Sequence, residues 1–165
     1  LIIFLINEKI ILVIYMFPKI RELRKSNNLT QKDTASKLEV TQQTYQMFES
    51  STKIIPLKHL IKLCNYYKVS LNYISGLTNT NSQTNLHINL DQIEIGKRIK
   101  LIRLKCNLLQ IDLARLLNTS QSQISSYEHG TRLISTAFAY QICKTYNISL
   151  DWLINGTGKV FLNDN

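Results

Sequence analysis

The sequence predicts an all-α protein built from two copies of one small five-helix domain joined by a polar linker. Only 5 Gly and 2 Pro occur among the 165 residues, too few for a turn-rich β fold. Residues 20–71 align with residues 99–150 without a gap, and 16 of the 52 aligned positions are identical. Apolar residues recur at helical spacing in both copies. A duplicated helical domain accounts for all three observations.

The first two helices of each copy are predicted from apolar spacing and from a capping motif. Ile20 and Leu23 lie on one helical face, and Ile99 and Ile102 repeat this spacing. A second helix is expected to open at Thr30, because a threonine followed three residues later by an acidic residue is typical of a helix N-terminus.

The remaining three helices follow the same logic. The third is expected to open at Thr41 in copy one and at Ser120 in copy two, where Gln123 completes a capping-box spacing. The fourth is expected to start near Pro56, because proline suits a first helical turn. A short fifth helix should follow Ser70 and its counterpart Ser149, so each copy is a compact all-α domain.

The domain limits follow from the repeat and from composition. An Asn-, Thr- and Ser-rich stretch separates the copies and predicts a linker. The expected organisation is an apolar extension over 1–15, domain 1 over 16–79, a linker over 80–94, domain 2 over 95–159 and a tail over 160–165.

The N-terminal extension is unusual. It is apolar, but Asn7, Glu8 and Lys9 interrupt it, and neither half has the roughly 20 residues that a spanning helix needs. We hypothesise that translation starts at Met16 and that residues 1–15 are not native; a short membrane-associating helix is the alternative.

Charge indicates a polyanionic partner. The chain has 20 Lys and Arg against 11 Asp and Glu, a net charge of +9. Residues 17–76 and 95–159 each carry a net charge of +6, so the surplus belongs to the repeated unit. Double-stranded DNA is the first expectation and an anionic membrane the second, less favoured one.

Other sites are not expected. The three cysteines are odd in number and form no Cys-x-x-Cys pair, which favours a reducing, cytoplasmic setting. The three histidines have no metal-ligand spacing, so no metal and no other cofactor is predicted. We find no nucleophile triad, phosphate loop or paired carboxylates, and no small-molecule site is evident; an enzyme is not expected.

Two segments carry a family resemblance. LRKSNNLTQKDTASKLEVTQQTYQMFES in copy one and IRLKCNLLQIDLARLLNTSQSQISSYEHG in copy two resemble the Cro/CI-type, lambda-repressor-like helix-turn-helix family, also called the xenobiotic-response-element type. The resemblance covers residues 17–79 and 95–158. It implies that the helices opening at Thr41 and Ser120 are recognition helices that enter the major groove.

The resemblance also implies residue roles. Side chains at the leading part of each recognition helix would contact bases, and glutamine suits adenine because its amide donates and accepts at once; these are Gln42, Gln43, Thr44, Gln46, Gln121, Ser122, Gln123 and Ser125. Phosphate contacts are expected from Gln31, Lys32, Thr41, Lys53, Gln110, Arg115, Ser120 and Arg132. Arg24 with Glu49, and Arg103 with Glu128, are expected to form internal ion pairs with a structural role.

Each copy departs from the family pattern. Copy one has Thr34 where copy two has Leu113, so its second helix is expected to lose an apolar anchor. It also has Ser51 where Gly130 supplies a glycine exit. Copy two lacks the threonine cap of the second helix and has Leu109 instead.

The sequence therefore predicts a sequence-specific DNA-binding regulator, of repressor type, that reads DNA with one or both recognition helices. A homodimer would carry four such domains. The alternative is an antitoxin-like or other protein-interaction module in which one copy serves dimerisation or partner binding.

Overall fold

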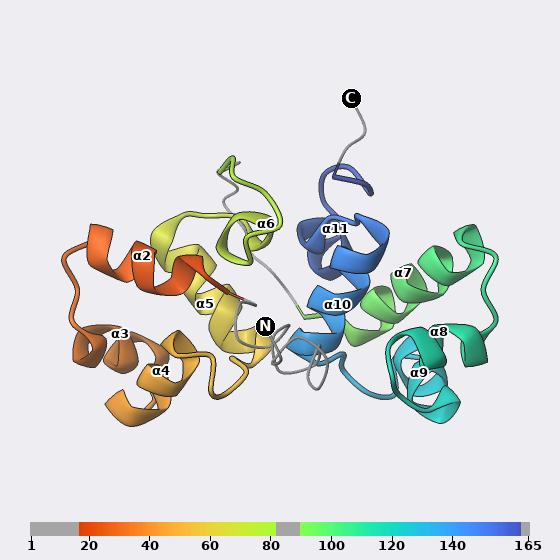
Figure 1. The fold of residues 1–165 in the computed structure, drawn as a ribbon, viewed down its shortest axis with the longest axis horizontal. Coiled ribbons are helices and arrows are strands. Elements are labelled where there is room, and N and C mark those ends of the chain that lie inside the picture. Colours follow the sequence, from red (N-terminus) through yellow and green to blue (C-terminus); the bar gives the residue numbers. More distant parts are fainter. Residues whose placement is uncertain (1–16, 82–89, 163–165) are drawn as a thin grey trace, which may run out of the picture. The chain divides into compact units, whose positions relative to one another are not determined.

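The computed structural model describes residues 17–81 and 90–162, which separate into two compact units, Leu1–Leu86 and His87–Asn165. Within this part of the chain all regular secondary structure is α-helical and no β-strand occurs, as the sequence predicts (Figure 1). Residues 1–15, for which a non-native or membrane-associating extension is expected, lie outside the described residues, and so does most of the predicted linker.

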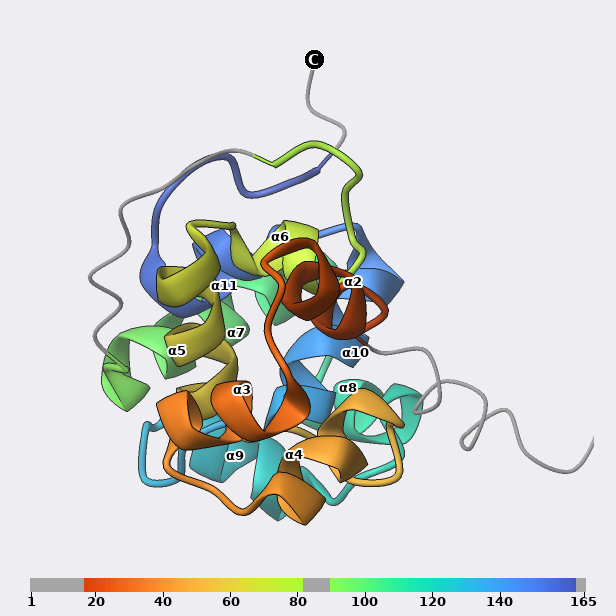
Figure 2. The same cartoon turned by 90° about the vertical axis from the view of Figure 1, so that its left-hand side faces the viewer.

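Each unit contains five helices in the described residues, the number predicted. Unit 1 has α2 (Lys19–Ser26), α3 (Gln31–Leu38), α4 (Gln42–Glu49), α5 (Leu57–Tyr67) and α6 (Leu71–Ile74). Unit 2 has α7 (Gln92–Lys105), α8 (Gln110–Leu116), α9 (Gln121–Glu128), α10 (Thr136–Tyr146) and α11 (Leu150–Asn155). Both views show α3 and α4 side by side, at the opposite end of unit 1 from α6 (Figures 1 and 2).

The predicted helix starts are largely confirmed. Thr30 forms a full capping box with Asp33, because its hydroxyl accepts from the Asp33 N–H at 3.1 Å and the Asp33 carboxylate accepts from the Thr30 N–H at 2.9 Å. Thr41 and Ser120 each accept a backbone N–H three residues later. Pro56 is the N-cap residue of α5 and does not lie in the first turn, because its ψ of 145° is extended.

The core of each unit comes from equivalent positions. Tyr45 of α4 and Ile124 of α9 are fully buried, and so are Leu71 and Leu150 at the start of the last helices. Thr34 replaces the apolar anchor Leu113 with a polar side chain that is still completely buried, and its hydroxyl donates to the Thr30 carbonyl at 3.3 Å.

Two features of unit 2 differ from expectation. Helix α7 begins at Gln92, inside the predicted linker, with Asp91 as its cap. Gly96 makes this extension fit, since a Cβ there would lie 2.3 Å from the Tyr127 carbonyl oxygen. Residues 160–162 are not a tail: the Val160 carbonyl accepts from Ser149 at 2.8 Å, and the Leu162 N–H donates to the 147 carbonyl at 2.9 Å.

Candidate nucleic-acid interface

An internal ion pair joins the first and third helices of each unit. The Arg24 Nε lies 2.5 Å from Glu49 Oε1, and the Arg103 Nε lies 2.6 Å from Glu128 Oε1. Both glutamate side chains are almost completely buried, and each arginine is bound through two nitrogens. Hydrogen bonding to the carboxylate raises the pKa of both guanidinium groups.

Each pair extends to the second helix. Gln31 Nε2 donates to Glu49 Oε2 at 2.9 Å, and Gln110 Nε2 donates to Glu128 Oε2 at the same distance. Burial by itself would raise the pKa of Glu49, but the hydrogen bonds from Arg24 and Gln31 outweigh it and leave that pKa below its usual value. We call these three-residue sets the Arg–Glu–Gln networks. They fix the start of the second helix against the end of the third.

In the Arg–Glu–Gln networks, the two glutamine side chains already have internal hydrogen-bond partners. The sequence assigns Gln31 and Gln110 to phosphate contact, but in the structure their side-chain amides donate to the buried carboxylates. A phosphate at either position would therefore meet the backbone N–H groups of the helix start first.

The leading end of α4 presents free side chains to solvent. Gln42, Gln43 and Gln46 are exposed, whereas Thr44 is half-buried and its hydroxyl lies 2.9 Å from that of Thr41. Helix α4 buries Tyr45 and Phe48 against the body of the domain. The three glutamines lie on the other side of the helix and therefore point away from the domain.

The leading end of α9 is more restricted. Gln121 and Ser122 are exposed. Gln123 is half-buried: its Oε1 accepts from the Thr119 hydroxyl, and its Nε2 donates to the Tyr127 hydroxyl, both at 2.6 Å. The predicted capping box is thus only half formed, because the Gln123 side chain turns to these partners and not to the cap. Ser125 lies 3.3 Å from His129 Nδ1.

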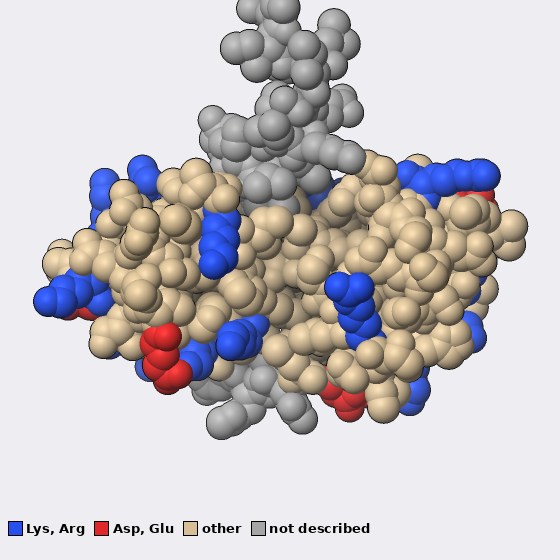
Figure 3. Space-filling model, turned by 90° about the horizontal axis from the view of Figure 1, so that it is seen from below, with Lys and Arg blue, Asp and Glu red and all other residues tan. Residues whose placement is uncertain are grey.

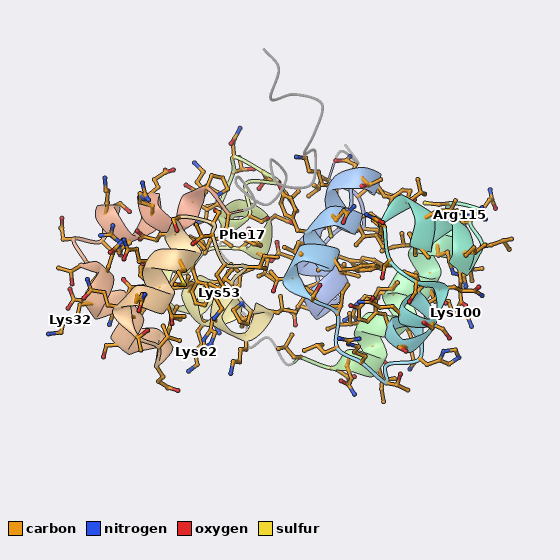
Figure 4. The ribbon with its side chains drawn as sticks, turned by 60° about the horizontal axis from the view of Figure 1, so that its bottom comes forward. Phe17, Lys32, Lys53, Lys62, Lys100 and Arg115 are labelled. Carbon is orange, nitrogen blue, oxygen red and sulfur yellow. The ribbon has the colours of Figure 1, made fainter. Side chains whose placement is uncertain are left out.

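The basic residues assigned to phosphate lie on the second helices, α3 and α8, and in the segments that follow α4 and α9. Lys32, Lys53, Arg115 and Arg132 are all exposed, and Arg115 makes only a long ion pair of 3.9 Å with Asp112. Figure 4 shows Lys32 projecting from the edge of unit 1. Within each unit, uncharged side chains separate the basic ones on the face seen in Figure 3. Such a surface suits polar base contact between scattered phosphate contacts.

Sequence reasoning missed one contrast between the units. Lys32 and Lys37 on the second helix of unit 1 correspond to Ile111 and Leu116 in unit 2. The signal was available, because the repeat alignment pairs these positions directly. Arg115 stands where unit 1 has Ser36, so α8 carries one basic residue and α3 carries two.

Some kinds of site are not found. In residues 17–81 and 90–162, no group of three or more His, Cys, Asp or Glu residues could hold a metal ion. No helix in the same ranges is long and apolar enough to cross a membrane.

Comparison with known proteins identifies both copies. The family model described as Helix-turn-helix matches residues 20–74 and 99–153, about two thirds of the chain. Antitoxin PezA of Streptococcus pneumoniae serotype 4 (strain ATCC BAA-334 / TIGR4) is 40% identical over 55 residues, which cover 33% of this chain and 35% of that protein.

Two further relatives match to a similar degree. The uncharacterized HTH-type transcriptional regulator YobD of Bacillus subtilis (strain 168) is 38% identical over 60 residues, covering 36% of this chain and 54% of YobD. Repressor protein CI of Enterobacteria phage phi80 is 39% identical over 64 residues, covering 39% of this chain and 27% of CI. The matched segment thus spans about half or less of each relative.

One solved structure illustrates the extent of structural likeness. The P22 c2 repressor protein, in complex with synthetic operator 9T, is 25% identical and has a TM-score of 0.36. The match covers 38% of this chain and 96% of the repressor chain.

Proposed function

The chain belongs to the helix-turn-helix family, and from that premise we propose that it binds double-stranded DNA sequence-specifically as a transcriptional regulator. The observation that carries the proposal is the duplicated Arg–Glu–Gln network, which in both units positions a helix whose first residue is an exposed glutamine, Gln42 or Gln121. The net charge of +9 supplies attraction to phosphate.

Base contact is assigned to the exposed members of the predicted set. Gln42, Gln43 and Gln46 would read one half-site through α4, and Gln121 and Ser122 would read another through α9. A glutamine amide can bond to both N6 and N7 of adenine in the major groove. Because the two sets of side chains differ, the two half-sites should be related but unequal in sequence.

Phosphate contact is assigned to the flanking cations and helix starts. Lys32, Lys53, Arg115 and Arg132 are exposed beside the recognition helices. Thr41 and Ser120 remain in the set, through hydroxyls that already cap α4 and α9. Affinity for DNA should fall steeply with salt, because each neutralised phosphate releases counterions.

The proposal includes repression in the cytoplasm, without catalysis. Similarity to a phage CI repressor supports repression. None of the three cysteines forms a disulfide, which fits a reducing compartment. The second candidate is a protein-interaction role for one copy, which the 40% identity to an antitoxin favours.

Selection of bound sequences from a random duplex pool, with the full chain, tests the main proposal. We expect enrichment of one defined site. Gln42→Ala and Gln121→Ala should each weaken binding to it by about 1–3 kcal/mol. Gln92→Ala, an exposed glutamine at the start of α7, is the matched control and should leave binding unchanged. Failure to enrich any sequence, or equal effects of all three variants, would overturn the proposal.

A further inference from the structure

Four exposed leucines of unit 2, two on α7 and one at each end of α8, have no covering partner in the described part of the chain. We propose that this surface binds an acidic amphipathic helix of a partner protein, an activity beyond DNA binding. The leucine surface consists of Leu101, Leu104, Leu109 and Leu116. Their exposed fractions are 42%, 54%, 67% and 54%, far above those of core leucines in the same unit such as Leu113 at 0%.

The leucines are arranged on two consecutive elements. Leu101 and Leu104 are three residues apart and share one side of α7. Leu109 is the extended N-cap residue of α8 and Leu116 is the last residue of that helix, so these two leucines mark its two ends. The short turn between the helices is fixed, because the Leu108 N–H donates to the Arg103 carbonyl at 3.0 Å and the Arg103 Nη1 donates to the Leu108 carbonyl at 2.8 Å.

Unit 1 shows that the fold does not require leucine at these positions. The counterparts of the leucine surface, in order, are Glu22, Lys25, Thr30 and Lys37. All four are exposed and occupy the same places on α2, before α3 and on α3. Four large exposed apolar side chains on two consecutive elements are more than the scattered single ones that a surface ordinarily carries, and such a concentration marks an interaction site. The difference between the copies therefore assigns the leucines a role that is separate from folding.

Basic side chains border the leucine surface. Around α7, the helical spacing places Leu101 and Leu104 between Lys100 and Lys105. Both lysines are exposed, and neither is paired with a carboxylate in residues 90–162. Arg115 on α8 is 75% exposed beside Leu116. Figure 4 shows Lys100 and Arg115 on unit 2.

The charge of this border selects the occupant. In a two-fold dimer the same patch would meet its own copy, so the lysines of one border would approach those of the other. Like charges in such a contact are unfavourable. An amphipathic helix with leucines on one face and glutamates beside them would cover the apolar side chains and pair with the border.

The probe is a synthetic amphipathic helical peptide with leucines on one face and glutamates on both flanks. It is titrated into the ¹⁵N-labelled full chain and followed by chemical shifts. We expect saturable shifts confined to residues 97–117. A peptide of the same composition and charge in scrambled order is the control and should cause no saturable shifts there, because net attraction to a basic protein does not need an apolar face.

The decisive variant replaces the leucine surface with its unit 1 counterparts, L101E/L104K/L109T/L116K. Unit 1 carries these residues in the same helices, so unit 2 should stay folded, which its amide spectrum reports. Peptide affinity should fall at least tenfold. The reciprocal variant E22L/K25L/T30L/K37L should bring new shifts to unit 1. Binding of DNA through Gln42 should survive the first variant, so loss of peptide binding and loss of the DNA function are separate results.

Three outcomes would overturn the proposal. Equal binding of the peptide and its scrambled control would show charge attraction alone. A wild-type dimer in sedimentation that the first variant converts to monomer would make the occupant a second copy. Binding of the peptide to a chain starting at Met16 but not to the full chain would make residues 1–15 the occupant.

Discussion

The two units build the same interior and present different exteriors. In both, an arginine, a glutamate and a glutamine join three helices, and the arginine–glutamate distances of 2.5 Å and 2.6 Å are almost equal. Outside this interior the copies diverge at positions that the fold does not constrain. A duplicated scaffold thus permits each surface to take its own binding role.

The units also differ where the chain reverses with positive φ. Glu39, Ser51 and Lys68 adopt φ of 58°, 58° and 54° in unit 1. Their counterparts are Asn118, Gly130 and Asn147, with φ of 49°, 64° and 54°. Asparagine and glycine tolerate this left-handed conformation better than other residues do. Unit 1 therefore holds the same backbone path with less suitable residues.

The largest effect should come from breaking one network in each unit. Arg103→Ala leaves the Glu128 carboxylate buried without its partner and should lower the stability of unit 2 by about 3–5 kcal/mol. Arg24→Ala should cost less, because Arg21 Nε remains 3.7 Å from Glu49 Oε2. Hydrogen exchange measured on the full chain reports each unit separately, with Arg132→Ala as an exposed control. Equal losses in the two units would contradict this difference.

A smaller effect of opposite sign is expected at the exits of the third helices. Gly130→Ala should destabilise unit 2 by about 1–3 kcal/mol, because φ is +64° and the new Cβ would lie 2.7 Å from Ile93 Cα. Ser51→Gly should stabilise unit 1 by up to about 1 kcal/mol. Thermal unfolding and hydrogen exchange check both. A destabilising Ser51→Gly would show that the serine is not strained.

The caps of the second helices offer a similar exchange. Thr30→Ala removes a complete capping box and should cost unit 1 about 1 kcal/mol. Leu109→Thr should stabilise unit 2 by a similar amount, because the Asp112 carboxylate already accepts from the residue 109 N–H at 3.0 Å. Urea unfolding of the full chain, with local exchange rates, measures both. If Leu109→Thr gains nothing, the half-formed box already satisfies this helix start.

The smallest effect concerns phosphate contact. Lys32→Ala should weaken binding to all DNA sequences alike. It should also make the negative slope of log affinity against log salt shallower by about 1. Ile111→Lys should make the salt dependence steeper by about the same amount, since it adds the lysine that unit 1 has at the equivalent position, Lys32. Fluorescence anisotropy with a labelled duplex at several salt concentrations measures the slope. Unchanged slopes would remove these positions from the interface.

Local features of the fold could be read from the sequence. Thr30, Thr41 and Ser120 cap helices where they were predicted to, because capping depends on residues within one turn. The Arg24–Glu49 and Arg103–Glu128 pairs were also assigned, through the family resemblance. Their hydrogen bonds to Gln31 and Gln110 were not, since these depend on how three helices pack.

Features that depend on distant contacts could not be predicted. Arg98 donates to the carbonyls of Leu153 and Ile154, more than fifty residues away, and ties α7 to the end of α11. Gln123 has the spacing of a capping residue, but Thr119 and Tyr127 offer its amide both an acceptor and a donor. In each case the local sequence is compatible with several hydrogen-bond partners for the side chain, and tertiary packing determines which of them it binds.

The central claim is that both units read DNA through duplicated helices with different side chains. A hydroxyl-radical footprint of the full chain on its selected duplex tests it most directly. We predict two protected half-sites of related but unequal sequence, one lost with Gln42→Ala and the other with Gln121→Ala. A single protected half-site, abolished by one of these variants and untouched by the other, would contradict the claim.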